Sequence, residues 1–138
     1  MQKILIDTDV LLDFFFDRQP FSEDSSKVLN LCEINKIQGF VTPVIISNVY
    51  YLLRKTAHHE KVIEKLIQSL TFIDILLIDK FCIEKALSSE FKDFEDALQN
   101  FAAENNSEIN AIITRNVKDF KKSNLPIFTP ENYIKIIV

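Results

Sequence analysis

Short apolar segments alternate with longer segments of helical periodicity along the whole chain. Apolar, β-branched segments predict strands, and the amphipathic segments between them predict helices. This alternation is typical of parallel strands joined by helices that cover both faces of the sheet. We therefore expect an α/β fold in one domain that spans residues 1–138, with a mainly parallel central sheet of four to five strands flanked by helices. The expected strands cover residues 3–6, 40–42, 72–78, 109–114 and 127–128.

Capping residues and helix-breaking residues set the expected helix boundaries. Thr8 or Asp9 can cap the helix that follows the first strand, and Ser22 can cap a second helix that ends at Gly39. Caps for later helices are expected at Asp79 and Thr129, the latter followed by Pro130 at the first helical position. The remaining expected helices cover residues 43–56, 58–70 and 93–104, with a short helix within 114–122.

The single glycine, Gly39, narrows the classes of phosphate-binding site that the chain can build. Neither a dinucleotide-binding fingerprint nor a P-loop can be written with one glycine. The net charge of −4 argues against a non-specific DNA-coating protein, which is normally basic. A nuclease is not excluded, because a bound metal ion offsets acidic groups in its site.

The cysteines and the lengths of the apolar segments bear on the cellular compartment. Cys32 and Cys82 lie in apolar, helix-like surroundings without metal-ligand spacing, so we expect buried free thiols in a reducing compartment. The longest uncharged stretch, residues 38–53, is shorter than the roughly 20 residues that a membrane span needs. Strand-like residues begin at Lys3, so no secretory leader is expected. These features predict a soluble, cytoplasmic protein.

Four aspartates lie near the ends of predicted strands or at the start of a predicted helix. Asp7 follows the first strand directly, Asp93 and Asp96 open a helix, and Asp119 follows the strand at 109–114. In an α/β fold, the carboxyl ends of the strands are where polar groups gather. Carboxylates gathered there suit a hard divalent cation such as Mg²⁺ or Mn²⁺. The leading hypothesis is metal-assisted hydrolysis of a phosphodiester.

Each of these aspartates also has a structural interpretation. Asp93 can cap the helix that it opens, with Asp96 as a first-turn acid that the helix dipole favours. Asp7 can cap the following helix, although it is partly desolvated by the preceding strand and so needs a cation or hydrogen-bond donors. Asp119 lies in a lysine-rich turn and can be an ordinary surface residue.

Four segments, in order, resemble the motifs of PIN-domain ribonucleases. They are residues 7–13 (DTDVLLD), 47–55 (SNVYYLLRK), 93–98 (DFEDAL) and 113–120 (ITRNVKDF), and the closing segment 127–131 fits the same pattern. The resemblance implies a three-layer α/β sandwich and Mg²⁺- or Mn²⁺-dependent cleavage of RNA. It further implies a relationship to VapC-type toxins, which commonly form homodimers and bind a cognate antitoxin.

The resemblance also assigns roles to matching positions of this chain. The metal ligands would be Asp7, Asp96 and Asp119, and Asp93 would join them as an auxiliary catalytic acid. Among the supporting residues, Thr8 and Thr114 would orient waters or ligands. Asn48 and Asn116 would also support the site, and Asn116 stands where many relatives have another acid.

Asn48 departs from the family pattern, because the second motif usually carries a glutamate there. An amide can bind a metal through its carbonyl oxygen, but it adds no charge and cannot act as a base. Glu95 is not expected to replace the glutamate, since its helical phase turns it away from Asp93 and Asp96. This departure motivates an alternative hypothesis, a degenerate PIN module that binds RNA or a protein partner without cleavage.

Basic residues near the motifs suggest contacts to RNA phosphates. Tyr50 and Tyr51 are expected in the core rather than as base-stacking platforms. Ordinary solvated charge is the alternative interpretation for the basic residues. The candidate phosphate-binding residues are Arg54, Lys55, Arg115 and Lys118.

The segment Asp7-Thr8-Asp9 also resembles the Asp-x-Asp arrangement of phosphatases that form an aspartyl-phosphate. A matching lysine-plus-acid arrangement further along the chain is not recognisable in the sequence. Phosphatase chemistry is therefore the third hypothesis, after RNA hydrolysis and RNA or protein binding without cleavage.

Overall fold

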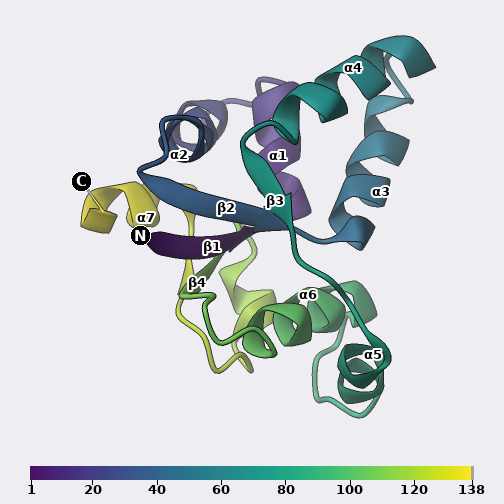
Figure 1. The fold of residues 1–138 in the computed structure, drawn as a ribbon, viewed down its shortest axis with the longest axis vertical. Helices are drawn as coiled ribbons and strands as arrows, with labels where there is room; N and C mark the ends of the chain where they lie inside the picture. The colour runs from purple at the N-terminus through teal and green to yellow at the C-terminus, as the bar shows by residue number, and fades with distance from the viewer. Residues whose placement is uncertain (138) are drawn as a thin grey trace.

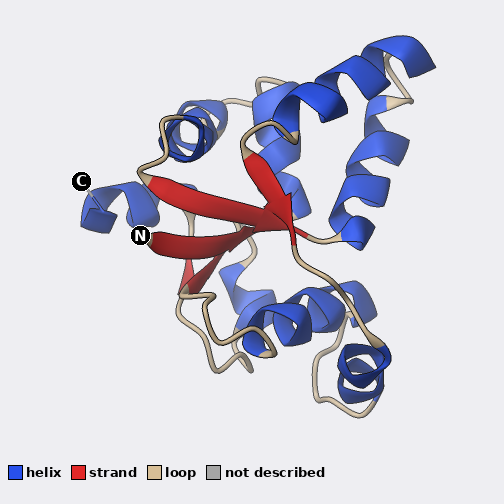
Figure 2. Cartoon of the chain, viewed as in Figure 1, coloured by secondary structure: helices blue, strands red, loops and turns tan. Residues whose placement is uncertain are grey.

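Five parallel strands form the centre of the protein, and helices cover both faces of the sheet (Figure 2). The computed structural model describes residues 1–137. The expected α/β class with a parallel sheet is confirmed, in a three-layer arrangement. The strands are β1 (Gln2–Ile6), β2 (Ile37–Val41), β3 (Ile73–Ile75), β4 (Ala111–Ile113) and β5 (Ile127–Phe128), in the order β3-β2-β1-β4-β5.

The helices lie in two layers, one on each face of the sheet (Figure 1). On one face lie α1 (Thr8–Phe15), α2 (Ser22–Glu33), α3 (Pro43–Leu53) and α4 (His59–Ser69). On the other lie α5 (Lys80–Leu87) and α6 (Phe94–Glu104), and the terminal helix α7 (Pro130–Ile137) packs against α2. The short 3-10 helix η1 (Val117–Phe120) contacts α6. Within residues 1–137 no helix combines the length and the apolar character that a membrane crossing requires.

The central strand β1 is buried on both faces. Ile4, Leu5 and Ile6 expose none of their surface. Continuous apolar character is what a parallel strand needs when helices cover both faces of its sheet. Asp7 follows this strand directly, so the fold carries a carboxylate to the edge of the core.

The order in which strands are added to the sheet changes side at β1, so β1 and β4 flank a topological reversal point. The chain first moves outward from β1 through β2 to β3, and then returns to the other side of β1 to form β4 and β5. The backbone N–H of Asp7 donates to the carbonyl oxygen of Ile113 over 3.0 Å, which joins the carboxyl ends of β1 and β4. Ligands of open α/β folds bind at the carboxyl edge beside such a reversal point. The topology therefore predicts a ligand site beside Asp7 and Thr114, the first residues after β1 and β4.

The helix expected to run from Ser22 to Gly39 ends earlier, and that expectation was wrong. Helix α2 stops at Glu33, and Gly39 lies inside β2. Asn35 has a φ of 61°, in the left-handed region, which ends the helix before the chain enters the strand. Gly39 instead allows close packing, because a Cβ atom there would lie 2.7 Å from the sulfur of Cys32. Burial raises the pKa of the Cys32 thiol to about 12.

Several expected boundaries shift by a few residues. Asp7, rather than Thr8 or Asp9, is the cap of α1. Ser22 is the first residue of α2 and makes no capping bond at its start. The third and fourth strands are three residues long and shorter than expected. Three expected capping residues accept a backbone N–H bond as predicted: Asp79, Asp93 and Thr129.

Candidate active site

A cavity of about 390 Å³ opens at the carboxyl edge of the sheet, beside the reversal point. Its walls come from the start of α1, the middle of α3, the start of α6 and the loop after β4. Acidic and amide side chains dominate its polar lining. The lining residues are Asp7, Thr8, Asp9, Leu12, Asn48, Tyr51, Leu52, Glu95, Asp96, Gln99 and Asn116.

Asp7 is buried at the base of this cavity, with 7% of its surface exposed. One carboxylate oxygen accepts the backbone N–H of Thr8 over 2.8 Å, and the other accepts the hydroxyl of Thr114 over 2.8 Å. Burial raises the pKa of the Asp7 carboxyl, although both hydrogen bonds oppose this effect. The negative charges of Asp93 and Asp119 raise it further. The Asp7 carboxylate is therefore held rigidly, in surroundings where a nearby cation would stabilise it.

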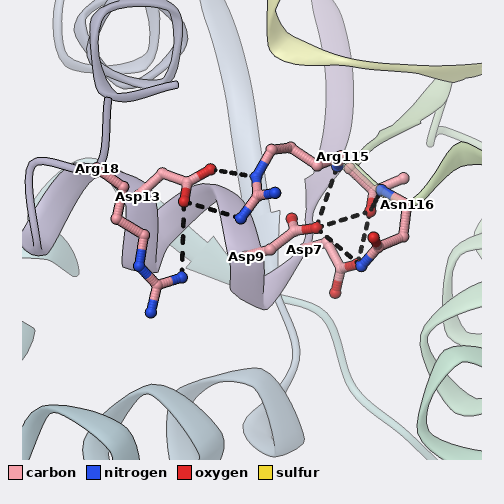
Figure 3. Close-up of polar contacts among 7 residues, drawn as sticks. Asp7, Asp9, Asp13, Arg18, Arg115 and Asn116 are labelled. Atoms are coloured by element: carbon pink, nitrogen blue, oxygen red, sulfur yellow. Dashed lines mark hydrogen bonds and ion pairs between the residues drawn. The ribbon is translucent and has the colours of Figure 1, made fainter. Parts of the chain in front are cut away.

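Asp9 lies at the centre of the polar network in Figure 3. Its Oδ2 accepts the backbone N–H of Arg115 and the side-chain amide of Asn116, both over 3.1 Å. Its Oδ1 is buried and has no hydrogen-bond partner among the described residues. Burial, followed by the neighbouring charge of Asp7, raises the pKa of Asp9 to about 7. Sequence reasoning treated Asp9 as a cap or a phosphatase acid and missed its place in this cluster.

The start of α6 brings Asp93 and Asp96 to the same edge. Asp93 caps the helix by accepting the backbone N–H of Asp96 over 2.9 Å, as its structural interpretation predicted. Asp96 lines the main cavity and a neighbouring cavity of about 470 Å³ that Asp93 and Asp119 also line. Partial burial, and then the charges of Asp7, Asp93, Asp119 and Asp9, raise the pKa of Asp96 to about 7. The fold thus gathers all four aspartates that the sequence singled out.

Glu95 also lines the cavity, which its helical phase relative to Asp93 and Asp96 did not predict. The side-chain amide of Asn48 donates to Glu95 Oε2 over 2.9 Å, and both residues line the main cavity. The contact joins α3 to α6 across the opening. Asn48 itself adds no charge, but its side-chain amide holds the Glu95 carboxylate in the wall of the cavity.

Behind the cavity, Arg115 forms an ion pair with a buried acid (Figure 3). Asp13 exposes none of its side chain and accepts two bonds from the guanidinium, over 2.6 Å and 3.1 Å. Arg18 lies farther away, 3.7 Å from the same carboxylate. The guanidinium of Arg115 also lies over the ring of Phe21, 4.0 Å from its centroid. Asp13 was missed in the sequence, where its place four residues after Asp9 was the available signal.

The remaining candidate basic residues do not line the main cavity. Arg54 and Lys55 follow the end of α3, and Lys118 lines the neighbouring cavity with Lys92, Lys121 and Lys122. Tyr51, in contrast, belongs to the wall of the main cavity. It is 64% exposed and lines the main cavity, so the expectation that it packs in the core was wrong. Tyr50 is partly buried against the core, and its hydroxyl contacts His59 Nδ1 over 2.8 Å.

The donor set suits a hard divalent cation. The polar lining residues offer carboxylate, hydroxyl and amide oxygens and include no histidine or cysteine, and one buried carboxylate oxygen of Asp9 lacks a partner among the described residues. Burial, and with it the negative charges of neighbouring aspartates, raises the pKa values of Asp7, Asp9 and Asp96, so a cation would stabilise their charged forms. Among the described residues, no three acidic, histidine or cysteine side chains are drawn together closely enough to hold an ion alone. Water would complete the coordination, as is usual for Mg²⁺.

Comparison with known proteins agrees with this architecture. Residues 3–118 match the PIN domain family. The chain is similar to Ribonuclease VapC1 from Aquifex aeolicus (strain VF5), with 26% identity over 137 residues. The similarity covers 96% of this chain and 93% of that protein.

Solved structures share the fold as well. A toxin-antitoxin complex from Klebsiella pneumoniae contains a chain with a TM-score of 0.68 and 26% identity. VapBC2 from Rickettsia felis, bound to a DNA fragment from its promoter, gives a TM-score of 0.65 at 16% identity, which supports the fold alone. Each likeness covers 92% of this chain and 97% of the other. Because the family match extends over most of the sequence, the chain belongs to the PIN domain family.

Proposed function

We propose that this protein is a metal-dependent endoribonuclease that hydrolyses RNA phosphodiester bonds. The observation that carries the proposal is the meeting of Asp7, Asp9 and Asp96 in one cavity at the carboxyl edge of the sheet. Buried carboxylates with raised pKa values are costly to keep charged without a cation. The similarity to Ribonuclease VapC1 supports RNA as the substrate class.

The metal ligands in this proposal are Asp7, Asp96 and Asp119, with Mg²⁺ or Mn²⁺ as the ion. The bound cation would supply Lewis-acid activation of water and of a phosphoryl oxygen. Thr114 orients the Asp7 carboxylate through its hydroxyl, and Asp93 fixes the first turn of α6 and so presents Asp96.

Other side chains complete the site in supporting roles. Asn116 holds Asp9 through its side-chain amide, and Asn48 holds Glu95. Thr8 lines the cavity and would orient a water or a phosphate oxygen. The proposed phosphate contacts are Arg54, Lys55, Arg115 and Lys118. Among them, Arg115 also forms an ion pair with Asp13, which ties the loop after β4 to helix α1.

Asn48 motivated the alternative of a PIN module that binds without cleaving. The bond from Asn48 to Glu95 favours cleavage, because it keeps a further carboxylate in the cavity wall. The match to the PIN domain family and the similarity to Ribonuclease VapC1 favour RNA hydrolysis over the phosphatase alternative.

The toxin role follows from the relatives and forms part of the proposal. A toxin-antitoxin complex with 26% identity to this chain supports a cognate antitoxin as a protein partner in the cytoplasm. A homodimer is the expected assembly, and light scattering of the purified protein tests it. Co-expression with the product of an adjacent small gene tests the antitoxin partner.

The experiment that tests the activity uses purified protein and mixed cellular RNA. With Mn²⁺ present we expect cleavage that EDTA abolishes, and no release of nitrophenol from p-nitrophenyl phosphate. RNA that binds but stays intact in Mn²⁺ would instead support the non-cleaving module. Hydrolysis of p-nitrophenyl phosphate with intact RNA would support the phosphatase.

A further inference from the structure

Tyr51 stands out among the residues of the main cavity. It is a large aromatic side chain with 64% of its surface exposed, whereas the preceding Tyr50 packs partly against the core. An exposed aromatic ring alone needs no explanation on a protein surface. This ring, however, is part of the wall of the acidic cavity, so it borders the atoms that would meet a substrate.

The position of Tyr51 on α3 points its side chain toward the opening. It lies three residues after Asn48, and residues three apart share a face of a helix. Asn48 contacts Glu95 on α6, so this face of α3 looks across the cavity. Tyr51 is thus the aromatic member of the face on which Asn48 donates its hydrogen bond to Glu95.

Lys55 adds a cation to the same place. Its ammonium nitrogen lies 5.1 Å from the centroid of the Tyr51 ring. A nucleobase stacked on the ring would carry its attached phosphate into the neighbourhood of this ammonium group. Ring and cation together offer the two contacts that proteins use for unpaired nucleotides.

The negative charge of the protein makes a base contact that does not depend on charge important for RNA binding. The chain carries a net charge of −4, and its cavity is lined by carboxylates. Phosphate contacts alone are weakened by such a field, whereas stacking on an aromatic ring does not depend on charge.

We propose that Tyr51, with Lys55 beside it, stacks an unpaired base of the RNA substrate at the entrance of the acidic cavity. The proposal rests on the proposed ribonuclease function and assigns Tyr51 and Lys55 as the residues that hold an unpaired nucleotide beside the site. Bases of a duplex are stacked on one another and cannot lie on a side chain.

The helix α5 offers a matched control. Phe81 is 52% exposed, and the ammonium nitrogen of Lys85, four residues later, lies 5.6 Å from its ring. The pair therefore reproduces the spacing and chemistry of Tyr51 and Lys55. Phe81 does not line the acidic cavity. Substituting either ring removes an exposed aromatic side chain from a helix surface with a similar cost in stability.

The test measures binding by fluorescence anisotropy in Ca²⁺, which is used in place of Mn²⁺ to suppress cleavage. The probes are a labelled oligouridylate and an oligomer of the same length built from abasic ribose phosphates. We expect Tyr51→Ala to weaken oligouridylate binding about 5- to 150-fold and to leave the abasic oligomer unchanged. Tyr51→Phe should retain most of the affinity, and Phe81→Ala should bind both probes like the wild type. An oligouridylate annealed into a duplex should bind the wild type more weakly than the single strand.

The outcomes separate this proposal from the function on which it rests. If Tyr51→Ala weakens the binding of both probes equally, the residue has a structural role, and the stacking proposal is overturned. The proposed RNA cleavage by the wild type would not be affected by this result. Unchanged binding of both probes would overturn the stacking proposal as well, as expected if Tyr51 serves only a protein partner. A wild type that neither binds nor cleaves RNA would overturn both proposals.

Discussion

The hydroxyl of Thr114 donates a hydrogen bond to Asp7 Oδ2 over 2.8 Å, although 107 residues separate the two along the chain. The bond exists because β1 and β4 are neighbours in the sheet and both residues follow their strands directly. It lowers the pKa of Asp7 against the effect of burial, and so favours the charged carboxylate. Thr114 is therefore a positioning residue for the proposed metal ligand.

Thr114→Val should weaken Mn²⁺ binding about 10- to 100-fold, the usual effect of removing a group that orients a metal ligand. The variant keeps the shape of the side chain but loses the donor to Asp7. Isothermal titration with Mn²⁺ measures the change. Thr114→Ser restores the hydroxyl and should bind nearly like the wild type. Equal affinities in the Val and Ser variants would show that the hydrogen bond has no part in metal binding.

Glu95→Gln should reduce the rate of Mn²⁺-dependent RNA cleavage about tenfold, because it removes one carboxylate from the cavity wall and changes its bond with Asn48. Glu84→Gln is the control, since Glu84 is an exposed residue of α5 outside this cavity. Initial rates on one labelled RNA at a fixed Mn²⁺ concentration give the comparison. If both variants cleave at the wild-type rate, Glu95 does not compensate for Asn48.

Arg115→Met should lower the free energy of unfolding by about 3–5 kcal/mol, because it leaves the buried charge of Asp13 without its partner. Arg18→Met should cost less than about 1 kcal/mol, since Arg18 is 43% exposed and lies 3.7 Å from the same carboxylate. Urea denaturation of the two variants measures both values. Similar losses would mean that the two arginines share the charge of Asp13 equally.

Stability of the metal-free protein should fall as the pH rises through about 7, the value to which the pKa of Asp9 and of Asp96 is raised. A raised pKa means that the folded state holds the proton more tightly than the unfolded chain. This contribution is therefore fully present below the unfolded pKa and is lost as the pH passes the folded one.

Asp9→Asn removes one of these groups and isolates the effect. In EDTA, the variant should gain stability relative to the wild type between about pH 5 and about pH 8. Thermal melting at the two pH values measures the difference. Adding Mn²⁺ at the higher pH should stabilise the wild type, because a cation offsets the same charges. A difference between variant and wild type that does not change with pH would contradict the assignment of the shift to Asp9.

Features with a local cause were predictable from the sequence. The apolar run before Asp7 predicts a buried strand, and β1 is buried along its second half. Asp93 has the spacing of a helix cap and forms that bond with Asp96. The alternation of strand-like and helix-like segments also predicts the parallel sheet. The aspartates meet because such a sheet brings the carboxyl ends of its strands to one edge.

Features that depend on contacts between distant segments were not predictable in this way. The pairing of Asp13 with Arg115 spans 102 residues. Helical phase correctly separates Glu95 from Asp96 by about 100°, but it does not say that Asn48 on α3 faces α6 from the other side. From the sequence alone, Gly39 predicts the end of a helix. In the structure it lies in β2, where the absence of a side chain lets the sulfur of Cys32 pack against the strand. In each case the deciding neighbour belongs to another element.

The central claim is that the carboxylates at this edge of the sheet cleave RNA with a divalent cation. Single-turnover cleavage of a labelled RNA by the wild type and by Asp96→Asn, both in Mn²⁺, tests it most directly. We predict that the variant loses roughly 100-fold or more in rate, while thermal melting shows that it remains folded and its RNA binding in Ca²⁺ stays close to that of the wild type. Cleavage by Asp96→Asn at the wild-type rate would contradict the account.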